Sequence, residues 1–144
     1  KSGDTRVVSI DSKRNAVIRG TGKTEIRVTA SLKGRKTTTL KIPVYISPAK
    51  QPTPAARSKK SRQLTVSWKK DSNASGYQVM YSTDKNFKKN CKTVTVKSYK
   101  TVSTAIKKLT GNKYYYVRIR SYKKVPGGNL YGSWSTARKM KVRK

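Results

Sequence analysis

Apolar and polar residues alternate along most of this 144-residue chain. The alternation is clearest in residues 64–68, 76–81 and 114–120, where every second residue is large and apolar. Successive side chains of a strand point to opposite faces of a sheet, so a period of two predicts strands with one buried face. Clusters of Gly, Pro, Asn and Asp separate such segments and mark turns. The pattern predicts an all-β protein.

The expected strands fall into two groups on either side of a Pro-rich stretch. The first group comprises residues 7–10, 16–19, 24–30 and 39–46, and the second comprises 64–68, 77–81, 93–97, 101–107, 114–123 and 137–143, with a turn at 125–129. Between the groups, three prolines within seven residues predict a short, semi-rigid linker. We therefore expect a first domain at 1–47, a linker at 48–56, whose last residues could serve as an edge strand, and a second domain at 57–144.

The second group carries the motifs of a known family. Trp68 on the first of its strands, the pair Gly76-Tyr77, and Leu109 six residues ahead of Tyr115 resemble a fibronectin type III domain over residues 50–144. The resemblance implies a β-sandwich with structural roles for Trp68, Tyr77, Leu109 and Tyr115. It implies that the Tyr115 hydroxyl bonds back to the preceding corner of the chain, and that Trp134 packs against the sandwich edge.

The first group resembles the C-terminal part of a group 2 bacterial immunoglobulin-like domain. The similarity lies in residues 7–11, 16–22 and 24–30, and the strands that normally precede Val7 in that family are absent. Together the two resemblances imply two immunoglobulin-like β-sandwich modules in tandem, the first incomplete. Because half a sandwich cannot hide its apolar face, we expect another segment or molecule to cover the side chains of Val7, Ile26, Val28, Leu40 and Val44.

The strong positive charge of the chain indicates which binding partners would suit it. The chain has 36 Lys and Arg against 5 Asp and Glu, a net charge of +31, and residues 50–144 carry +23 of it. Such a surface suits anionic polymers, namely nucleic acid, teichoic-acid phosphates or acidic glycans, and also membrane surfaces. A highly charged, well-solvated surface without a dedicated site is the alternative. No apolar run is long enough to enter a bilayer as a helix, so we expect no membrane insertion.

The sequence contains few groups that could act in catalysis. The sequence has no His to act near neutral pH, its five acids are scattered, and Cys91 is the single cysteine. Paired carboxylates, a zinc site and an internal disulfide are therefore not expected, and neither is a cofactor. Cys91 is either an incidental loop thiol or a partner for another molecule. We expect the chain to be no enzyme, with any catalytic domain of a parent protein outside it.

One constellation could bind a ligand. If Tyr115, Val117 and Ile119 point inward, the neighbouring residues form an outward stripe of Tyr114, Tyr116, Arg118, Arg120 and Tyr122, beside Lys139, Lys141 and Arg143 of the last strand. Rings interleaved with cations could stack on sugars and pair with phosphate or sulfate. Cross-strand packing on a solvated face is the alternative.

These observations predict non-catalytic accessory modules. By resemblance they would space, present or tether a larger secreted or cell-surface protein of a Gram-positive bacterium, with the upstream domains of that protein as partners. The alternative is a binding module for an anionic cell-wall polymer or glycan. Nucleic-acid binding has charge in its favour but no matching motif, so no specific nucleic acid is expected.

Overall fold

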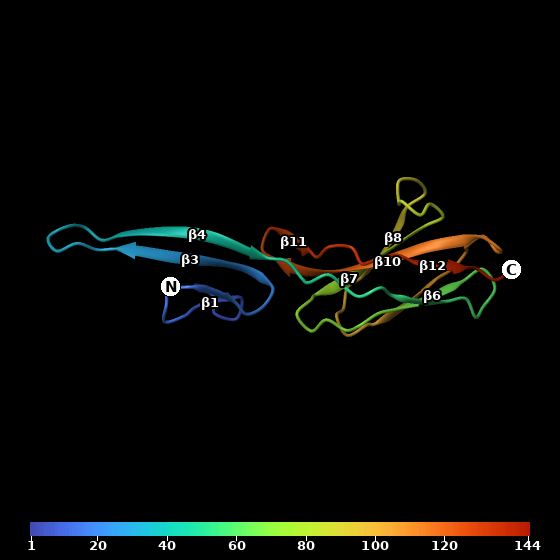
Figure 1. Ribbon diagram of the computed structural model, residues 1–144, viewed down its shortest axis with the longest axis horizontal. Coiled ribbons are helices and arrows are strands. Elements are labelled where there is room, and N and C mark those ends of the chain that lie inside the picture. Colours follow the sequence, from blue (N-terminus) through green and yellow to red (C-terminus); the bar gives the residue numbers. More distant parts are fainter. The chain divides into compact units, whose positions relative to one another are not determined.

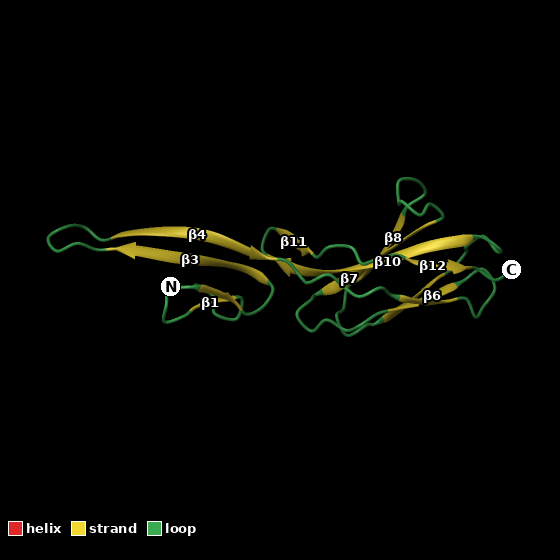
Figure 2. Ribbon diagram, in the orientation of Figure 1, coloured by secondary structure: helices red, strands yellow, loops and turns green.

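The protein is all-β, as the alternation predicts. The computed structural model describes residues 1–144 and contains strands but no helix (Figures 1 and 2). The strands are β1 (Val8–Ile10), β2 (Ala16–Ile18), β3 (Gly22–Ala30), β4 (Thr38–Ile46), β5 (Ala55–Arg57), β6 (Leu64–Ser67), β7 (Gly76–Ser82), β8 (Lys92–Val96), β9 (Ser103–Ile106), β10 (Tyr114–Val125), β11 (Gly128–Tyr131) and β12 (Arg138–Lys141).

The chain divides into two compact units. One consists of Lys1–Ser47 with Lys124–Leu130, and the other consists of Pro48–Lys123 with Tyr131–Lys144. We refer to them as the first and the second unit and describe each by itself.

The second unit is a sandwich of two antiparallel sheets. One sheet has the order β5-β6-β9, and the other has the order β10-β7-β8, with β12 also paired to β10. β11 pairs with β10 as well, but most of β11 and the last residues of β10 belong to the segment Lys124–Leu130 of the first unit. Alternate residues of the strands point into the space between the sheets, which is the arrangement of immunoglobulin-like sandwiches. The core residues below one-tenth exposure include Leu64, Val66, Trp68, Tyr77, Val79, Ile106, Leu109, Tyr115, Val117, Ile119 and Val142.

The last part of the chain differs from the expected single closing strand. The turn predicted at 125–129 is shorter, because β10 continues to Val125 and β11 begins at Gly128. Gly127 and Gly128 have φ values of +89° and +147°, a region that L-residues with side chains rarely adopt. Two separate strands, β11 and β12, then pair with β10, and residues 132–137 bridge between them.

Residues 1–47 of the first unit form two small antiparallel pairs, β1-β2 and β3-β4. β3 and β4 form the long two-stranded ribbon of Figure 1, in which Ile26 lies opposite Ile42 and Val28 opposite Leu40. Residues 1–3 add a short third segment beside β3, where the Gly3 N–H donates to the Glu25 carbonyl at 2.9 Å.

The apolar side chains of this unit are covered unequally. Val7 is buried within this chain. Ile26 and Val44 are half-buried. Val28 and Leu40 are 50% and 60% exposed. The exposed apolar side chains therefore lie near the turn that joins β3 to β4. That another segment or molecule covers them remains a prediction.

Candidate functional site

The outer face of β10 brings the predicted stripe together. Because Tyr115, Val117 and Ile119 are buried inside the sandwich, alternation places the residues between them on the opposite face. In the register of β10 with β12, Tyr114 lies opposite Lys141 and Tyr116 lies opposite Lys139. The stripe is therefore one continuous surface of the sheet, but its members have different surroundings.

Two arginines of β10 are enclosed between aromatic rings. The guanidinium carbon of Arg120 lies 4.0 Å from the ring centre of Tyr131 and 4.4 Å from that of Trp134. The guanidinium carbon of Arg118 lies 4.9 Å from Trp134 and 4.1 Å from Phe87. Rings and cations thus alternate in the order Tyr131, Arg120, Trp134, Arg118, Phe87, at distances typical of cation–π contacts. We call these five residues the Arg–aromatic stack.

Backbone bonds carry Trp134 to its place in the stack. Between β11 and β12, the Gly132 N–H donates to the Ser121 carbonyl at 2.9 Å and the Ser135 N–H donates to the Ile119 carbonyl at 2.8 Å. The Ser135 hydroxyl also accepts the Ile119 N–H at 3.0 Å. Residues 132–137 therefore follow the edge of β10 while Trp134 reaches over its outer face.

Both arginines donate to side chains of β7. Arg120 donates from Nε and Nη2 to Gln78 Oε1 at 2.9 and 2.7 Å. Arg118 donates from Nη2 to the Sδ of Met80 at 3.2 Å, and its Nε is buried without a partner. Burial lowers the pKa of Arg120 from its ordinary value, and the charge of Arg118 acts in the same direction. The faces of both guanidinium groups are covered by rings, and both arginines are half-buried.

Tyr122 lies on the expected face but is not open to a ligand. Its side chain is 7% exposed, and its ring centre lies 6.0 Å from that of Tyr131. A Cβ added at Gly76 would lie 2.7 Å from the Tyr122 hydroxyl and 2.2 Å from the Val96 carbonyl oxygen. Glycine at position 76 thus leaves room for Tyr122 to pack against the backbone. The face was predicted correctly, but the expectation that Tyr122 stacks on a ligand is corrected, because the residue is buried.

Four residues of the stripe lie together where β10 pairs with β12, and we call them the Tyr–Lys patch: Tyr114, Tyr116, Lys139 and Lys141. Tyr114 is 49% exposed, and the Nζ atoms of Lys139 and Lys141 lie 4.3 and 6.0 Å from its ring centre. Tyr116 is half-buried. Arg143, the last member of the predicted stripe, lies beyond β12 and donates from Nη1 to the Lys59 carbonyl at 3.2 Å.

The residues predicted to be structural lie in or beside the sandwich core. Trp68, Tyr77, Leu109 and Tyr115 are buried. The Tyr77 hydroxyl accepts the Asp71 N–H at 2.7 Å and donates to the Tyr99 carbonyl at 3.0 Å. Burial raises the pKa of Tyr77, so this hydroxyl stays protonated as a donor.

The corner between β9 and β10 is closed by a second tyrosine. The Tyr115 hydroxyl accepts the Thr110 N–H at 3.2 Å, which is the type of bond that the resemblance implies for a corner tyrosine. Trp134, expected at the sandwich edge, instead sits in the Arg–aromatic stack.

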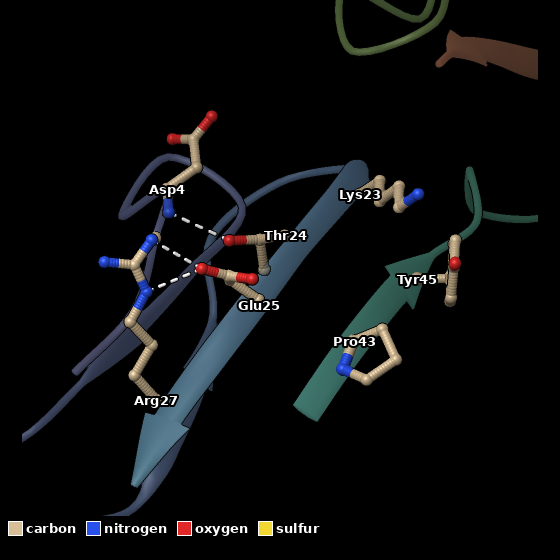
Figure 3. Close-up of a pocket in the computed structure, with 8 residues that line it drawn as sticks. Asp4, Lys23, Thr24, Glu25, Arg27, Pro43 and Tyr45 are labelled. Carbon is tan, nitrogen blue, oxygen red and sulfur yellow. Dashed lines mark hydrogen bonds and ion pairs between the residues drawn. The ribbon is translucent and has the colours of Figure 1, made fainter. Parts of the chain in front are cut away.

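The first unit contains an open depression of about 540 Å³ (Figure 3). Lys23, Glu25, Arg27, Pro43 and Tyr45 contribute to its wall. Arg27 Nε donates to Glu25 Oε1 at 2.6 Å, so the one carboxylate of β3 is neutralised by its neighbour. No cluster of three or more potential metal-ligating His, Cys, Asp or Glu residues occurs, and no helix is long and apolar enough to cross a membrane.

Sequence reasoning missed Phe87 and the pairing of rings with arginines. Phe87 lies in the loop between β7 and β8 and has a φ of +54°. No local sequence pattern predicts that its ring reaches Arg118. The sequence spacing of the other four residues of the Arg–aromatic stack could have indicated the pairing of rings with arginines. Arg118 and Arg120 are two residues apart on one strand, and Tyr131 and Trp134 follow three residues apart, which suits interleaving.

Comparison with solved structures identifies the fold of the chain as that of fibronectin type III domains. A two-domain fibronectin type III segment of chicken tenascin matches with a TM-score of 0.67 and 19% identity, covering 88% of this chain and 68% of that one. The FN1–FN3 domains of chicken CNTN1 match with 0.59 and 21%, covering 87% of this chain and 42% of that one. The FN5 domain of Drosophila Lar matches with 0.53 and 20%, covering 67% and 98%. No protein-family model and no curated protein sequence matches the chain.

Proposed function

We propose that this chain is a non-catalytic pair of modules that spaces or tethers the domains of a larger secreted or cell-surface protein. The observation that carries the proposal is the docking of the Pro-rich stretch on the second unit. Pro48, Gln51 and Pro54 are buried, and β5 begins immediately after them. A connection of this kind restricts the movement of the domains that it joins, because its residues are packed in a folded module and do not form a free chain.

Two contacts hold this stretch. Gln51 Nε2 donates to the Ser121 hydroxyl at 2.8 Å in a buried position, which ties it to β10. A Cβ added at Gly132 would lie 2.6 Å from the Pro48 carbonyl oxygen, so the absence of a side chain at 132 permits the close approach. Prolines with fixed φ further restrict the backbone. A short, stiff connection keeps neighbouring modules apart, and it loses little conformational entropy on ordering.

The cellular setting of the proposal rests on the resemblance of residues 7–30 to a group 2 bacterial immunoglobulin-like domain. That resemblance favours a Gram-positive bacterium, an extracellular location and upstream domains of the same protein as partners. The scarcity of cysteine is compatible with this setting, since Cys91 is the only one and is exposed. The uncovered Val28 and Leu40 are the surface that an upstream domain would contact.

The stiffness of the connection can be tested by backbone ¹⁵N relaxation of the 144-residue chain. We expect order parameters of about 0.85 at residues 48–54, equal to those of the sandwich strands. Gln51→Ala removes the bond to Ser121 and should lower them locally, whereas Lys50→Ala, at an exposed neighbour, should not. Order parameters below about 0.6 in the unaltered chain would contradict the proposal.

A second candidate function is binding of an anionic cell-wall polymer or glycan by the Tyr–Lys patch. The observation in its favour is an exposed ring, Tyr114, flanked by the ammonium groups of Lys139 and Lys141. Such a surface can stack on a sugar and pair with its phosphate or sulfate. A purely diffuse attraction would instead depend on charge alone and fall steeply with salt.

Titration with wall teichoic acid, a heparin-like glycan and DNA, each at low and high salt, separates these cases. Tyr114→Ala with Tyr116→Ala should weaken one glycan class at high salt. Tyr45→Ala is the matched control, because Tyr45 is also exposed and has Lys23 Nζ 5.4 Å from its ring centre in the other unit. Equal losses for all three polymers, or equal effects of the two variants, would remove this candidate.

A further inference from the structure

The second unit contains a hollow of about 480 Å³ that is separate from the Tyr–Lys patch. Residues at the end of β7 and the start of β8 form one side, and the stretch that follows β9 forms the other. Its lining consists of Tyr81, Thr83, Asn90, Lys92, Lys107, Lys108, Leu109, Thr110 and Tyr115. A volume of this order is typical of sites for small molecules, which lie within about 300–1,000 Å³.

The charges that line this hollow are all of one sign. Lys92, Lys107 and Lys108 contribute to it, and no acidic residue does. The unit has only two acids, Asp71 and Asp84, and neither forms a salt bridge. All three lysines are exposed, and three positive side chains around one hollow without an acidic neighbour favour an anion there.

Two phenol groups give the hollow a polar floor of a particular kind. The Tyr115 hydroxyl accepts the Thr110 N–H, so its own hydrogen is left for another acceptor. The rings of Tyr115 and Tyr81 lie 6.4 Å apart between centres, at a tilt of 49°. Burial raises the pKa of Tyr81, which keeps this phenol a neutral donor through the physiological range. The Tyr115 ring belongs to the sandwich core and Tyr81 packs against it, so only their hydroxyl groups are offered to a ligand. Such hydroxyl donors suit a sugar or polyol that carries an acidic group.

From this arrangement we propose that the hollow between the β7–β8 turn and residues 107–110 is a binding site for a tetrahedral oxyanion, phosphate or sulfate, carried on a sugar or polyol. The lysines supply the positive field for the oxyanion, and the two tyrosines hold its carrier. The site goes beyond the spacing function and uses no residue of the Tyr–Lys patch. Its ligand is a single unit of a polymer or a free small molecule, as opposed to an extended strand of charge.

The test is a ¹H–¹⁵N NMR titration of the 144-residue chain with glycerol 3-phosphate, galactose 6-sulfate and neutral glycerol, in salt of about 0.15 M, where exposed charges are screened beyond about 8 Å. We expect saturable shifts at the amides of Thr83, Asn90 and residues 107–110 with one or both anions, and none with glycerol. Saturation with either anion, without a response to neutral glycerol, supports an oxyanion site.

Matched variants separate the site from the general positive field. Lys92→Gln with Lys107→Gln should raise the dissociation constant about tenfold, whereas Lys59→Gln with Lys60→Gln, the same change of charge elsewhere, should change it less than about twofold. Tyr81→Phe keeps the ring, and we expect about threefold weaker binding from the lost hydroxyl. Unsaturable shifts spread over the surface lysines, or equal effects of the two double variants, would overturn the proposal. Such a result would leave the spacing function untouched.

Discussion

The guanidinium group of Arg120 lies over the indole ring of Trp134 in the second unit, with 4.4 Å between the guanidinium carbon and the ring centre. The contact joins a residue of the irregular stretch 132–137 to the middle of β10. It changes the interpretation of the stripe, because an arginine stacked between rings contributes to the packing of the sheet face. The most exposed ring of the stripe is Tyr114, which belongs to the Tyr–Lys patch.

We expect Trp134→Ala to destabilise the second unit by about 2 kcal/mol, because it removes ring contacts to both arginines of the stack, each worth about 0.5–2 kcal/mol. Urea unfolding followed by circular dichroism measures the effect. Lys139→Ala, which removes a cation from an exposed ring, is the control and should cost less than about 0.5 kcal/mol. Equal losses in the two variants would show that the stack contributes no more than an ordinary surface contact.

Trp68 should contribute more than Trp134 to the stability of the second unit. It is 9% exposed and packs inside the sandwich, with its ring centre 5.3 Å from that of Tyr77. We expect Trp68→Ala to cost about 3–5 kcal/mol, the usual range for a buried aromatic residue. Thermal unfolding provides the measurement. A melting temperature within a degree or two of the unaltered chain would show that the core does not depend on this ring.

The corner tyrosine makes a narrower prediction. Tyr115→Phe keeps the ring in the core and deletes only the hydroxyl that accepts the Thr110 N–H. We expect a loss of about 1 kcal/mol, the typical net value of one hydrogen bond. Comparison with Tyr114→Phe, an exposed neighbour without a hydroxyl bond of this kind, isolates the effect in the same unfolding assay. No difference between the two variants would contradict the structural role of the corner.

The fold was largely predictable from sequence, and the state of the stripe was not. The period-two pattern of residues 114–121 assigns each side chain to a face, and the buried positions of Val117 and Ile119 follow from it. The alternation of apolar and polar residues does not predict which distant side chains cover the outer face of a strand. The enclosure of Arg118 depends on Phe87 from a distant loop and on Trp134 from an irregular stretch, both long-range contacts.

The same distinction applies to the Pro-rich stretch and to Tyr122. Three prolines indicate an extended backbone, but the docking of that backbone depends on the lack of a side chain at Gly132. Similarly, Tyr122 obeys the predicted alternation, yet Gly76 beneath it and Tyr131 beside it bury the ring. In both places a glycine allows a close approach that the hydrophobic pattern does not encode.

Acid should weaken the second unit through Asp84. Its carboxylate accepts the N–H groups of Asn86, Lys88 and Lys89, and these bonds hold its pKa below the ordinary 3.8. A carboxyl whose pKa is lower in the folded state adds stability above its unfolded pKa and loses it as the pH falls through the folded value. We therefore expect a decline in stability below about pH 4 that is smaller in Asp84→Asn.

This pH dependence is measured by urea unfolding at a series of pH values. The sequence contains no His, so we expect stability to change little between about pH 5 and 8. Asp71→Asn is the comparison, because the Asp71 carboxylate accepts the N–H of Asn73. An acid decline that is unchanged in Asp84→Asn would show that the bonds of the β7–β8 loop do not contribute to it.

The uncovered face of the β3-β4 ribbon gives the last prediction. Val28 and Leu40 face each other across the ribbon and are half or more exposed. Replacing both by Thr should therefore leave the stability of the chain within about 0.5 kcal/mol, whereas Val8→Ala, at a buried site, should cost about 1–3 kcal/mol. The double variant should also bind less of a fluorescent hydrophobic dye, because such dyes report exposed apolar surface. A large loss of stability in the double variant would mean that these side chains are covered within the isolated chain, and the need for an outside cover would disappear.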